Sequence, residues 1–323
     1  MGRKRILIFK YSSKSKNPFY NIALEDFFFD FVNQKPDNIV LYFWQNQDTV
    51  VIGRNQDVFA ECNFDFMKEK NIKLVRRKTG GGAVFHDSEN LNFTFAVPKK
   101  YYNKEKTMNI IISALKKLGF DAYLSGRNDI LVNNKKISGN AYYNGKNATL
   151  HHGTILVNTN FEKMLNSLTP DISKLKSNGV KSVKSRVLNL SEIKKINVDD
   201  IKNAIEKEFL NFFIEQQNSE NLQENKIGKF TIKNSKNKIK KIQKEYMSKK
   251  WIFGGSVNYF MIAKQKFDWG LCEIKMNNEG HYKIFSDSLD VISIENAQKI
   301  LNKETVYKET ENKITDDIIK LLN

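Results

Sequence analysis

RRKTGGGAVFHD, residues 76–87, is the segment of this 323-residue chain that most narrowly restricts its fold. Three consecutive glycines, Gly80–Gly82, weaken any regular element, because each of them gains backbone freedom. Apolar residues precede and follow them over 73–77 and 83–86, so we expect a glycine loop between two strands. Successive backbone N–H groups in such a loop can form a concave site for an anion.

The residues beside the glycines favour a binding loop over a merely flexible hairpin. Arg76 and Arg77 stand directly before the loop, suited to a phosphate or a carboxylate, and a His-Asp pair follows it. The loop is not a P-loop, because no Gly-Lys-Ser/Thr follows and the next element is a strand. Its spacing does not fit a Rossmann fingerprint either. A zinc site is disfavoured, since His151 and His152 are adjacent on a predicted strand and their rings face opposite sides.

A second polar segment, SGRNDILVNNKKISG, spans residues 125–139. Asp129 opens an apolar strand, and Lys135 and Lys136 follow a polar turn. Adjacent strand residues face opposite ways, so at most one of these lysines points into a given cleft. An ammonium in a closing cleft would bridge a carboxylate and a phosphate. In a chain so rich in lysine, an exposed turn with two solvated lysines is the alternative.

Hydrophobic periodicity predicts the elements around these two segments. A helix is expected over 18–32, a second from a cap at Thr107 to a stop at Gly119, and a third over 199–213. Asn144 and Gly145 supply hairpin-turn chemistry between two strands. Strands are expected near 5–10, 39–44, 49–53, 73–77, 83–86, 91–97, 129–132, 136–143 and 149–157.

The remaining third of the chain changes in character. Residues 215–248 are poor in core residues and rich in Lys, Asn and Gln, which indicates an exposed polar helical connector. Strands return over about 258–286, with a turn at Asn277–Gly280, and short helices follow near 293–302 and 315–322. We therefore predict an α+β protein with a large domain over 1–248, the connector included, and a small C-terminal domain over 256–323.

The composition argues against several classes of protein. No apolar run approaches the roughly 20 residues that span a bilayer, and the apolar start is too short for a signal peptide, so we expect a cytoplasmic protein without a membrane partner. Cys62 and Cys272 are the only cysteines and support neither a disulfide framework nor a Cys-based metal site. The net charge of +17 comes mostly from lysines spread along the chain, whereas nucleic-acid binders more typically cluster their charge and use arginine.

Together these segments resemble the lipoate–protein ligase family, which shares its catalytic fold with biotin protein ligases and octanoyltransferases. The resemblance covers most of the chain, and its most specific part is RRxTGGGAVFHD with a downstream Lys-x-Ser-Gly. It implies a large mixed-sheet catalytic domain with a small α+β accessory domain. The other matching segments are NPFYNIALEDFF (17–28), WQNQDTVVIGRNQ (44–56), ECN (61–63), NLNFTF (90–95), SGRNDI (125–130), KKISGNAYY (135–143), HHGTILVN (151–158), SVKSRVLNL (182–190), WIFGG (251–255), KFDWG (266–270) and FSDSL (285–289).

The resemblance also implies roles for individual residues. Lys136 matches the essential lysine of the family, which leaves Lys135 as its solvent-facing neighbour, and Asp129 would help to hold Mg²⁺. The residues implied in binding the nucleotide and lipoyl-AMP are Lys136, Arg77, Thr79, Gly80, Gly81, Gly82, Ala83, Val84, Phe85, Ser182 and Arg186. The residues expected to line the lipoyl pocket or its mouth are Trp44, Arg76, His86 and Gly139.

The activity implied by the resemblance is ATP-dependent lipoate–protein ligation. Lipoate would be activated with ATP and Mg²⁺ as lipoyl-AMP and passed to a lysine of an acceptor domain, either a glycine-cleavage H protein or the E2 subunit of a 2-oxoacid dehydrogenase. We expect a monomer. The nearest alternative is a transferase of the same fold, which moves an octanoyl or lipoyl group without ATP through a cysteine. A basic nucleic-acid-binding protein with a degenerate ligase fold is the second alternative.

Overall fold

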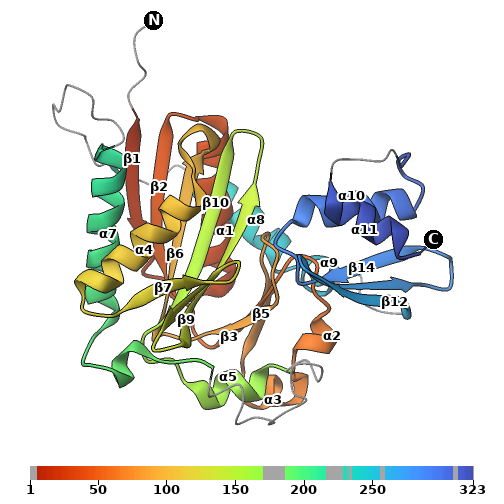
Figure 1. Ribbon diagram of the computed structural model, residues 1–323, viewed down its shortest axis with the longest axis horizontal. Coiled ribbons are helices and arrows are strands. Elements are labelled where there is room, and N and C mark those ends of the chain that lie inside the picture. Colours follow the sequence, from red (N-terminus) through yellow and green to blue (C-terminus); the bar gives the residue numbers. More distant parts are fainter. Residues whose placement is uncertain are drawn as a thin grey trace, which may run out of the picture.

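The structure is a computed structural model that describes residues 6–169, 186–215, 228–230, 232, 235–254, 259–307 and 312–322. Ser182, one of the predicted nucleotide contacts, lies outside the described residues. Figure 1 shows a large body built on one long sheet, with a smaller body formed by the C-terminal part of the chain. The described helices include no candidate for a membrane span.

An eight-stranded sheet forms the centre of the large body, in the order β11-β1-β2-β6-β10-β9-β8-β7 (Figure 1). β1 pairs in parallel with β2 and β11, whereas the remaining neighbours pair antiparallel, so the sheet is mixed as expected. Its strands are β1 (Leu7–Ser12), β2 (Asn38–Trp44), β6 (Asn90–Pro98), β7 (Ala122–Ser125), β8 (Asp129–Val132), β9 (Lys135–Asn144), β10 (Ala148–Leu156) and β11 (Gly228–Lys229).

Helices cover both faces of this sheet. α1 (Pro18–Gln34) and α8 (Lys236–Tyr246) contribute to the core on one face. α4 (Lys104–Lys117) and α7 (Val198–Glu215) contribute to the core on the other. Every residue of β2 and β6 is buried, because side chains from both faces of these strands find a covering layer. That explains why β2 appears in the sequence as a nearly continuous apolar run, whereas β6 also buries the polar residues Asn90, Asn92 and Thr94.

The glycine loop belongs to a separate three-stranded sheet in the order β4-β3-β5. The strands are β3 (Thr49–Ile52), β4 (Lys73–Arg76) and β5 (Ala83–His86), and the loop between β4 and β5 crosses the end of β3. A Cβ on Gly53, just after β3, would lie 1.8 Å from the Gly81 carbonyl oxygen, so this crossing requires glycine. Three short helices flank this sheet: α2 (Val58–Glu61), α3 (Phe64–Glu69) and α5 (Phe161–Ser167).

The small C-terminal body contains a three-stranded antiparallel sheet and two helices. The strands are β12 (Phe260–Phe267), β13 (Gly270–Met276) and β14 (Tyr282–Ser286), and the helices are α10 (Val291–Leu301) and α11 (Lys313–Lys320). Strands and helices fall where the sequence predicts them. A core of its own, including Ile274, Ile284 and Ile318, holds this body together. The domain limits at 248 and 256 stay a prediction.

Two sequence predictions about helices were wrong. Thr107 does not cap α4: Asn103 does, because its side chain accepts from Lys106 N, while the Thr107 hydroxyl donates back to carbonyls of the preceding turn. The second half of the predicted connector is not a solvated helix either. Ile239 and Tyr246 of α8 are buried in the core that α1 also shares, because one apolar face at helical spacing suffices to dock a polar helix.

Candidate functional site

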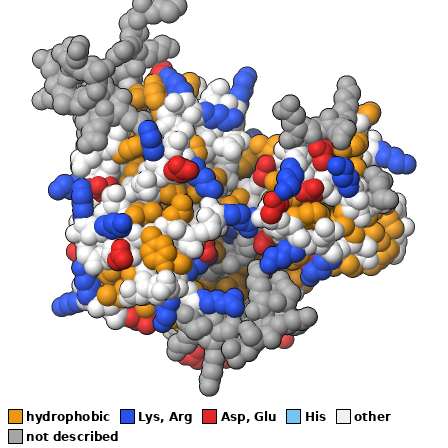
Figure 2. Space-filling view, in the orientation of Figure 1, with side chains coloured by type: hydrophobic (Ala, Val, Ile, Leu, Met, Phe, Trp, Pro, Cys, Tyr) orange, Lys and Arg blue, Asp and Glu red, His pale blue; other side chains and the backbone are white. Residues whose placement is uncertain are grey.

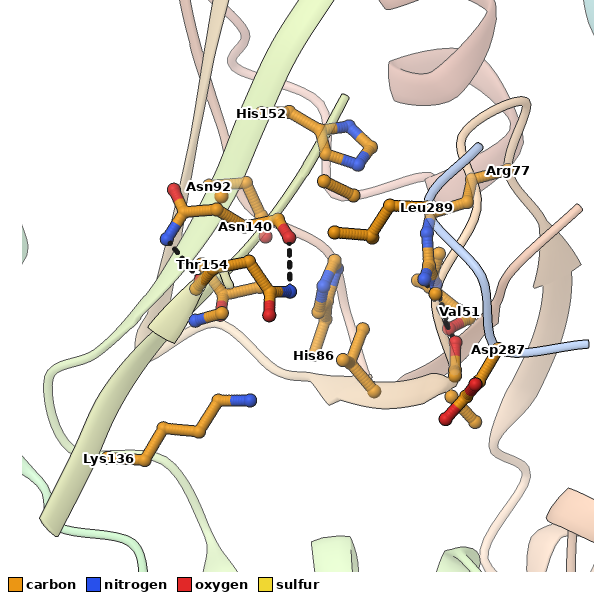
Figure 3. Close-up of a pocket in the computed structure, with 18 of the residues that line it drawn as sticks. Val51, Arg77, His86, Asn92, Lys136, Asn140, His152, Thr154, Asp287 and Leu289 are labelled. Carbon is orange, nitrogen blue, oxygen red and sulfur yellow. Dashed lines mark hydrogen bonds between the residues drawn. The ribbon is translucent and has the colours of Figure 1, made fainter. Parts of the chain in front are cut away.

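A cavity of about 200 Å³ opens between the glycine loop, strands β9 and β10, and the small body (Figure 3). Leu289 and Asp287 reach it from the small body, and Val51, Asn140 and His152 line it from the large one. Neither Leu289 nor Asp287 was predicted, because only the docking of the small body brings them there. The predicted site residues that line it are Trp44, Arg77, Gly81, Gly82, Ala83, Val84, His86, Lys136 and Gly139.

Lys136 projects from β9 toward this cavity (Figure 3). Its backbone is held by a neighbouring segment, since Lys136 N donates to Arg186 O at 2.7 Å and Leu188 N donates to Lys136 O at 3.0 Å. A register shift between β8 and β9 places Lys136 opposite Leu131. The Lys136 ammonium lies 2.8 Å from Asp129 Oδ1, and both side chains are about one-third exposed. A half-buried cation with one carboxylate partner stays available to a more highly charged anion.

Gly139 provides the space that the Lys136 side chain occupies. A Cβ on Gly139 would lie 3.1 Å from both Cε and Nζ of Lys136, which is closer than side chains normally pack. Gly139 is not in the left-handed region of backbone conformation. A glycine is therefore required here because a side chain would not fit, and not because of the backbone conformation. The Lys-x-Ser-Gly spacing therefore has a physical reason: the glycine leaves a groove along β9 for the ammonium.

Arg77 organises the glycine loop from inside. Its guanidinium is buried and donates to the carbonyl oxygens of Val51, Gly80 and Gly82 at 2.9, 2.7 and 2.9 Å. Burial lowers the pKa of Arg77 to about 10, so it keeps its charge at neutral pH. Gly81 has a φ of 91°, and its N–H donates to Ser288 O of the small body at 3.0 Å. Part of the expected loop amide site is therefore already engaged by the small body.

A chain of buried polar side chains connects the loop to the wall of the cavity. Arg77 Nε donates to Thr79 Oγ1, which lies 2.9 Å from His152 Nε2. His152 Nδ1 lies 2.8 Å from Glu25 Oε1, which also accepts from Thr94 Oγ1 at 2.7 Å. Trp44 Nε1 then donates to the same threonine hydroxyl at 3.0 Å. The sequence suggested residues 92–95 as a wall of the lipoyl pocket but did not single out Thr94, and it gave no role to Glu25. The available signal for Glu25 was a carboxylate within an apolar helix.

His86 is a neutral hydrogen-bonding group at the cavity. Burial, followed by the charge of Arg77, lowers its pKa to about 3. Its Nδ1 lies 3.2 Å from the Asn46 amide nitrogen and therefore accepts, which leaves the proton on Nε2. Nε2 is buried and has no hydrogen-bond partner among the described residues. The ring packs edge-on to Trp44, which fixes its orientation in the cavity wall.

The other predicted residues lie around the cavity rather than in its wall. Thr79 and Phe85 are buried behind the loop, and Gly80 packs so closely on the small body that a Cβ there would lie 2.1 Å from Ser288 O. Arg186 contributes its backbone oxygen while its side chain is exposed. Arg76 points elsewhere: its guanidinium donates to backbone carbonyls, including those of Gly53 and Ile252. Neighbouring residues at the end of a strand face opposite sides, so only Arg77 reaches the cavity.

The described residues offer few candidates for binding a metal or for thiol chemistry. The described residues contain no group of three or more His, Cys, Asp or Glu side chains placed to hold a metal ion. Cys62 and Cys272 are buried, and burial raises the pKa of each thiol to about 12. Neither thiol would ionise at neutral pH, and neither lines the cavity.

The charge of the protein is not gathered into one patch on the face that Figure 2 draws. Lys and Arg side chains are scattered over both bodies there, with Asp and Glu between them. A nucleic-acid interface would more typically concentrate its cations in a stripe.

Comparison with known proteins places this chain among ligases. The family model described as "Lipoyl protein ligase A/B catalytic domain" matches residues 17–210. The lipoate-protein ligase A of Psychrobacter cryohalolentis is 39% identical over 280 residues, which cover 85% of this chain and 82% of that protein. The crystal structure of P. falciparum LipL1 in complex with lipoate superposes with a TM-score of 0.78 at 28% identity, covering 98% of this chain and 99% of that one.

A bi-partite lipoate protein ligase, solved in a study of that ligase and its E2 lipoyl domain from Thermoplasma acidophilum, is similar with a TM-score of 0.64 at 26% identity. The match covers 77% of this chain and 96% of that one. The agreement in sequence extends over most of the chain, and the agreement in fold with LipL1 covers 98% of it. The chain therefore belongs to the lipoyl protein ligase A/B catalytic domain family and is a ligase enzyme.

Proposed function

We propose that this ligase uses ATP to convert lipoate into lipoyl-AMP and then transfers the lipoyl group to a lysine of an acceptor domain. The observation that carries the proposal is the Lys136 ammonium at a partly apolar cavity beside the glycine loop. An ammonium there suits the charge of an acyl phosphate, and apolar walls suit a lipoyl chain. The similar LipL1 structure holds lipoate, which supports lipoate as the substrate.

The first step overcomes the poor reactivity of a carboxylate. An oxygen of the lipoate carboxylate attacks the α-phosphorus of ATP, a new C–O–P linkage forms, and the bond to pyrophosphate breaks with its electrons on the leaving group. Negative charge increases on the nonbridging oxygens of the α-phosphate while the carboxylate enters and pyrophosphate leaves. Lys136 lies where it can stabilise that charge without rearranging, because Gly139 and the Arg186 carbonyl fix its position.

The cavity walls provide the binding energy and the orientation. Trp44, Val51 and Val84 present apolar surface to the lipoyl chain, and Leu289 closes the side toward the small body. His86 adds a neutral imidazole to the same wall, and its Nε2 has no partner among the described residues. Because this wall is joined to the loop through the Thr94–Glu25–His152 chain, substrate position and loop position are coupled.

In the second step the acceptor amine attacks the lipoyl carbonyl carbon. The amide bond forms, the bond to AMP breaks with its electrons on the phosphate, and the amine loses a proton to solvent. The Lys136 ammonium again stabilises the negative charge, first on the carbonyl oxygen and then on the departing phosphate. Excluding water protects the mixed anhydride, which would otherwise hydrolyse.

Mg²⁺ fits this site as a phosphate-bound ion. A magnesium ion needs only one or two protein carboxylates, since phosphates and waters complete its shell. Asp129 is the carboxylate nearest to Lys136 and would hold it. When bound, the ion would neutralise part of the phosphate charge.

A lipoyl domain is the proposed acceptor. The Thermoplasma study pairs its ligase with an E2 lipoyl domain, which supports an E2 subunit, and a glycine-cleavage H protein is the other candidate. The net charge of +17 would attract an acidic acceptor over long range at low salt.

The proposal is tested by incubating the enzyme with ATP, Mg²⁺, lipoate and an E2 lipoyl domain or H protein, followed by mass spectrometry of the acceptor. We expect the mass of one lipoyl group, located on one lysine, and none when ATP is omitted. Acyl transfer from an octanoyl carrier protein without ATP would instead support the transferase. The buried thiols, with pKa values raised to about 12, disfavour that outcome.

Salt-sensitive binding of random oligonucleotides without lipoyl-AMP formation would support a nucleic-acid-binding function.

A further inference from the structure

A second cavity, of about 290 Å³, lies between the large body and the small one. It shares no lining residue with the first cavity. Arg54, Asn55 and Arg76 line it from the large body, and Lys283, Glu295 and Lys299 line it from the small body. Four cationic side chains, of which Lys299 is exposed, thus line one interdomain cavity, and the proposed ligase chemistry uses none of them.

Arg76 is the most deeply buried of these cations, with 1% of the residue exposed. Its Nε and Nη1 donate to five backbone carbonyls, which fix the plane of the guanidinium. Its third nitrogen, Nη2, makes no hydrogen bond within the described part of the chain. Gly254, in the left-handed region at a φ of 59°, borders this nitrogen: a Cβ there would lie 3.4 Å from Nη2. Arg76 therefore brings one fixed, unused donor to the cavity wall.

Lys283 and Asn55 bring two further donors. Lys283 of β14 has no ion pair or hydrogen bond to any described residue, and burial, together with Arg54 and Arg76, lowers its pKa to about 8. The Asn55 amide nitrogen is buried without a partner in the described ranges. Of these three donors the Asn55 amide nitrogen is fully buried, and a buried donor without an acceptor is costly. Together with the unused donors of Arg76 and Lys283 beside the same cavity, it indicates a missing acceptor group.

The carboxylates at this cavity do not balance its cations. Glu295 accepts from Arg54 Nε at 2.9 Å, while Arg54 also stacks 4.3 Å over the Trp251 ring, so this carboxylate is already used. Glu304, which also lines the cavity, is exposed. Arg54 and Arg76 act on Lys283 as like charges, and an added anion would relieve this electrostatic repulsion.

We propose that this interdomain cavity binds a small polyvalent oxyanion of the phosphate class, held by Arg76, Asn55 and Lys283. Such an anion presents several acceptor oxygens to fixed donors from both bodies. The bodies already touch here, because Ser286 N donates to Asn55 O at 2.9 Å and Lys275 pairs with Asp57 at 2.6 Å. Bound anion would add a bridge between them and stabilise this arrangement by mass action.

Isothermal titration of the full-length enzyme with inorganic phosphate, at ionic strength held constant with NaCl, tests the site. We expect saturable binding that is about tenfold weaker in Lys283→Gln. The matched control is Lys266→Gln on the exposed strand β12, which should bind as the wild type does. Lys136→Ala should remove only phosphate binding at the first cavity and leave the Lys283-dependent binding in place, since Lys136 lines the other cavity. Absence of saturable binding, or a loss in Lys136→Ala but not in Lys283→Gln, would overturn the proposal.

A second variant gives the opposite sign and does not depend on how Lys283→Gln folds. Glu295→Gln removes the competing negative charge and should tighten phosphate binding severalfold; unchanged or weaker binding contradicts the site. Repeating the titration with pyrophosphate identifies the source of the anion. Tighter pyrophosphate binding points to the leaving group of adenylation, and tighter phosphate binding points to the free ion.

Discussion

At the scale of single residues, the site depends on how Gly139 accommodates Lys136. Gly139→Ala would place a methyl group 3.1 Å from Lys136 Cε and Nζ and so move the ammonium, the more mobile group. We expect a large fall in lipoyl-AMP formation with little change in the free energy of unfolding. Pyrophosphate exchange and urea unfolding measure the two quantities.

The control for this prediction is the double variant with Lys136→Ala. If the glycine acts through the lysine, Gly139→Ala adds nothing once Lys136 is removed. Additive losses of activity would show that the glycine serves some other purpose.

His86 should make stability depend on pH. Its pKa is about 3 in the folded protein against a usual value of 6.5, so below that value the unfolded chain binds a proton that the native state refuses. The free energy of unfolding should therefore fall as pH drops from about 6.5 toward 3, at up to about 1.4 kcal/mol per pH unit. His86→Gln should remove this part of the slope.

Urea unfolding of both proteins between about pH 7 and pH 5 measures the difference. His151, whose pKa burial also lowers, contributes equally to both and cancels. Parallel pH profiles for wild type and His86→Gln would contradict the assignment of a buried, neutral His86.

At the scale of elements, Thr79 joins the glycine loop to β10 and α1. Thr79→Val keeps the shape but leaves Arg77 Nε and His152 Nε2 without their shared hydroxyl. We expect a loss of about 1–3 kcal/mol in unfolding free energy, because two buried polar groups lose a partner, and a raised KM for lipoate from the loosened loop. Denaturant titration and steady-state kinetics measure both.

Thr149→Val is the matched control for Thr79→Val. Its hydroxyl bonds the exposed Asn144 at the far hairpin, so its loss should cost little and leave KM unchanged. Equal changes in unfolding free energy and KM for the two substitutions would contradict a specific role for the buried polar side chains that join Thr79 to β10 and α1.

The elements that the sequence predicted best are those with a strong apolar pattern. The apolar residues of β2, β6 and α1 predicted these elements, and the strands and charged residues beside the glycines predicted the loop. The start of α4 was missed because both Asn103 and Thr107 are capping residue types, and only the contacts distinguish them. The burial of α8 was missed because its apolar face is narrow.

At the scale of the whole molecule, the small body completes the site. Leu289 enters the cavity and Ser288 O accepts from Gly81 N, yet both lie some two hundred positions along the chain from the loop. No local pattern predicts such a contact, because it depends on how two separately packed cores dock. The directions of Arg76 and Arg77 are a second example. Strand alternation requires the two side chains to point opposite ways, but only the tertiary structure shows which of them faces the cavity.

Comparing the rates of lipoyl-AMP formation in Lys136→Ala and Lys135→Ala tests the proposed role of the Lys136 ammonium most directly. In a single turnover with excess enzyme, ATP and labelled lipoate, we measure the rate at which lipoyl-AMP forms. Loss of the ammonium at the cavity should slow this step by about 10²–10³-fold, as for a fixed donor at a developing charge. Lys135→Ala, on the neighbouring residue, should remain close to wild type. Lipoyl-AMP formation at the wild-type rate by folded Lys136→Ala would contradict the mechanism.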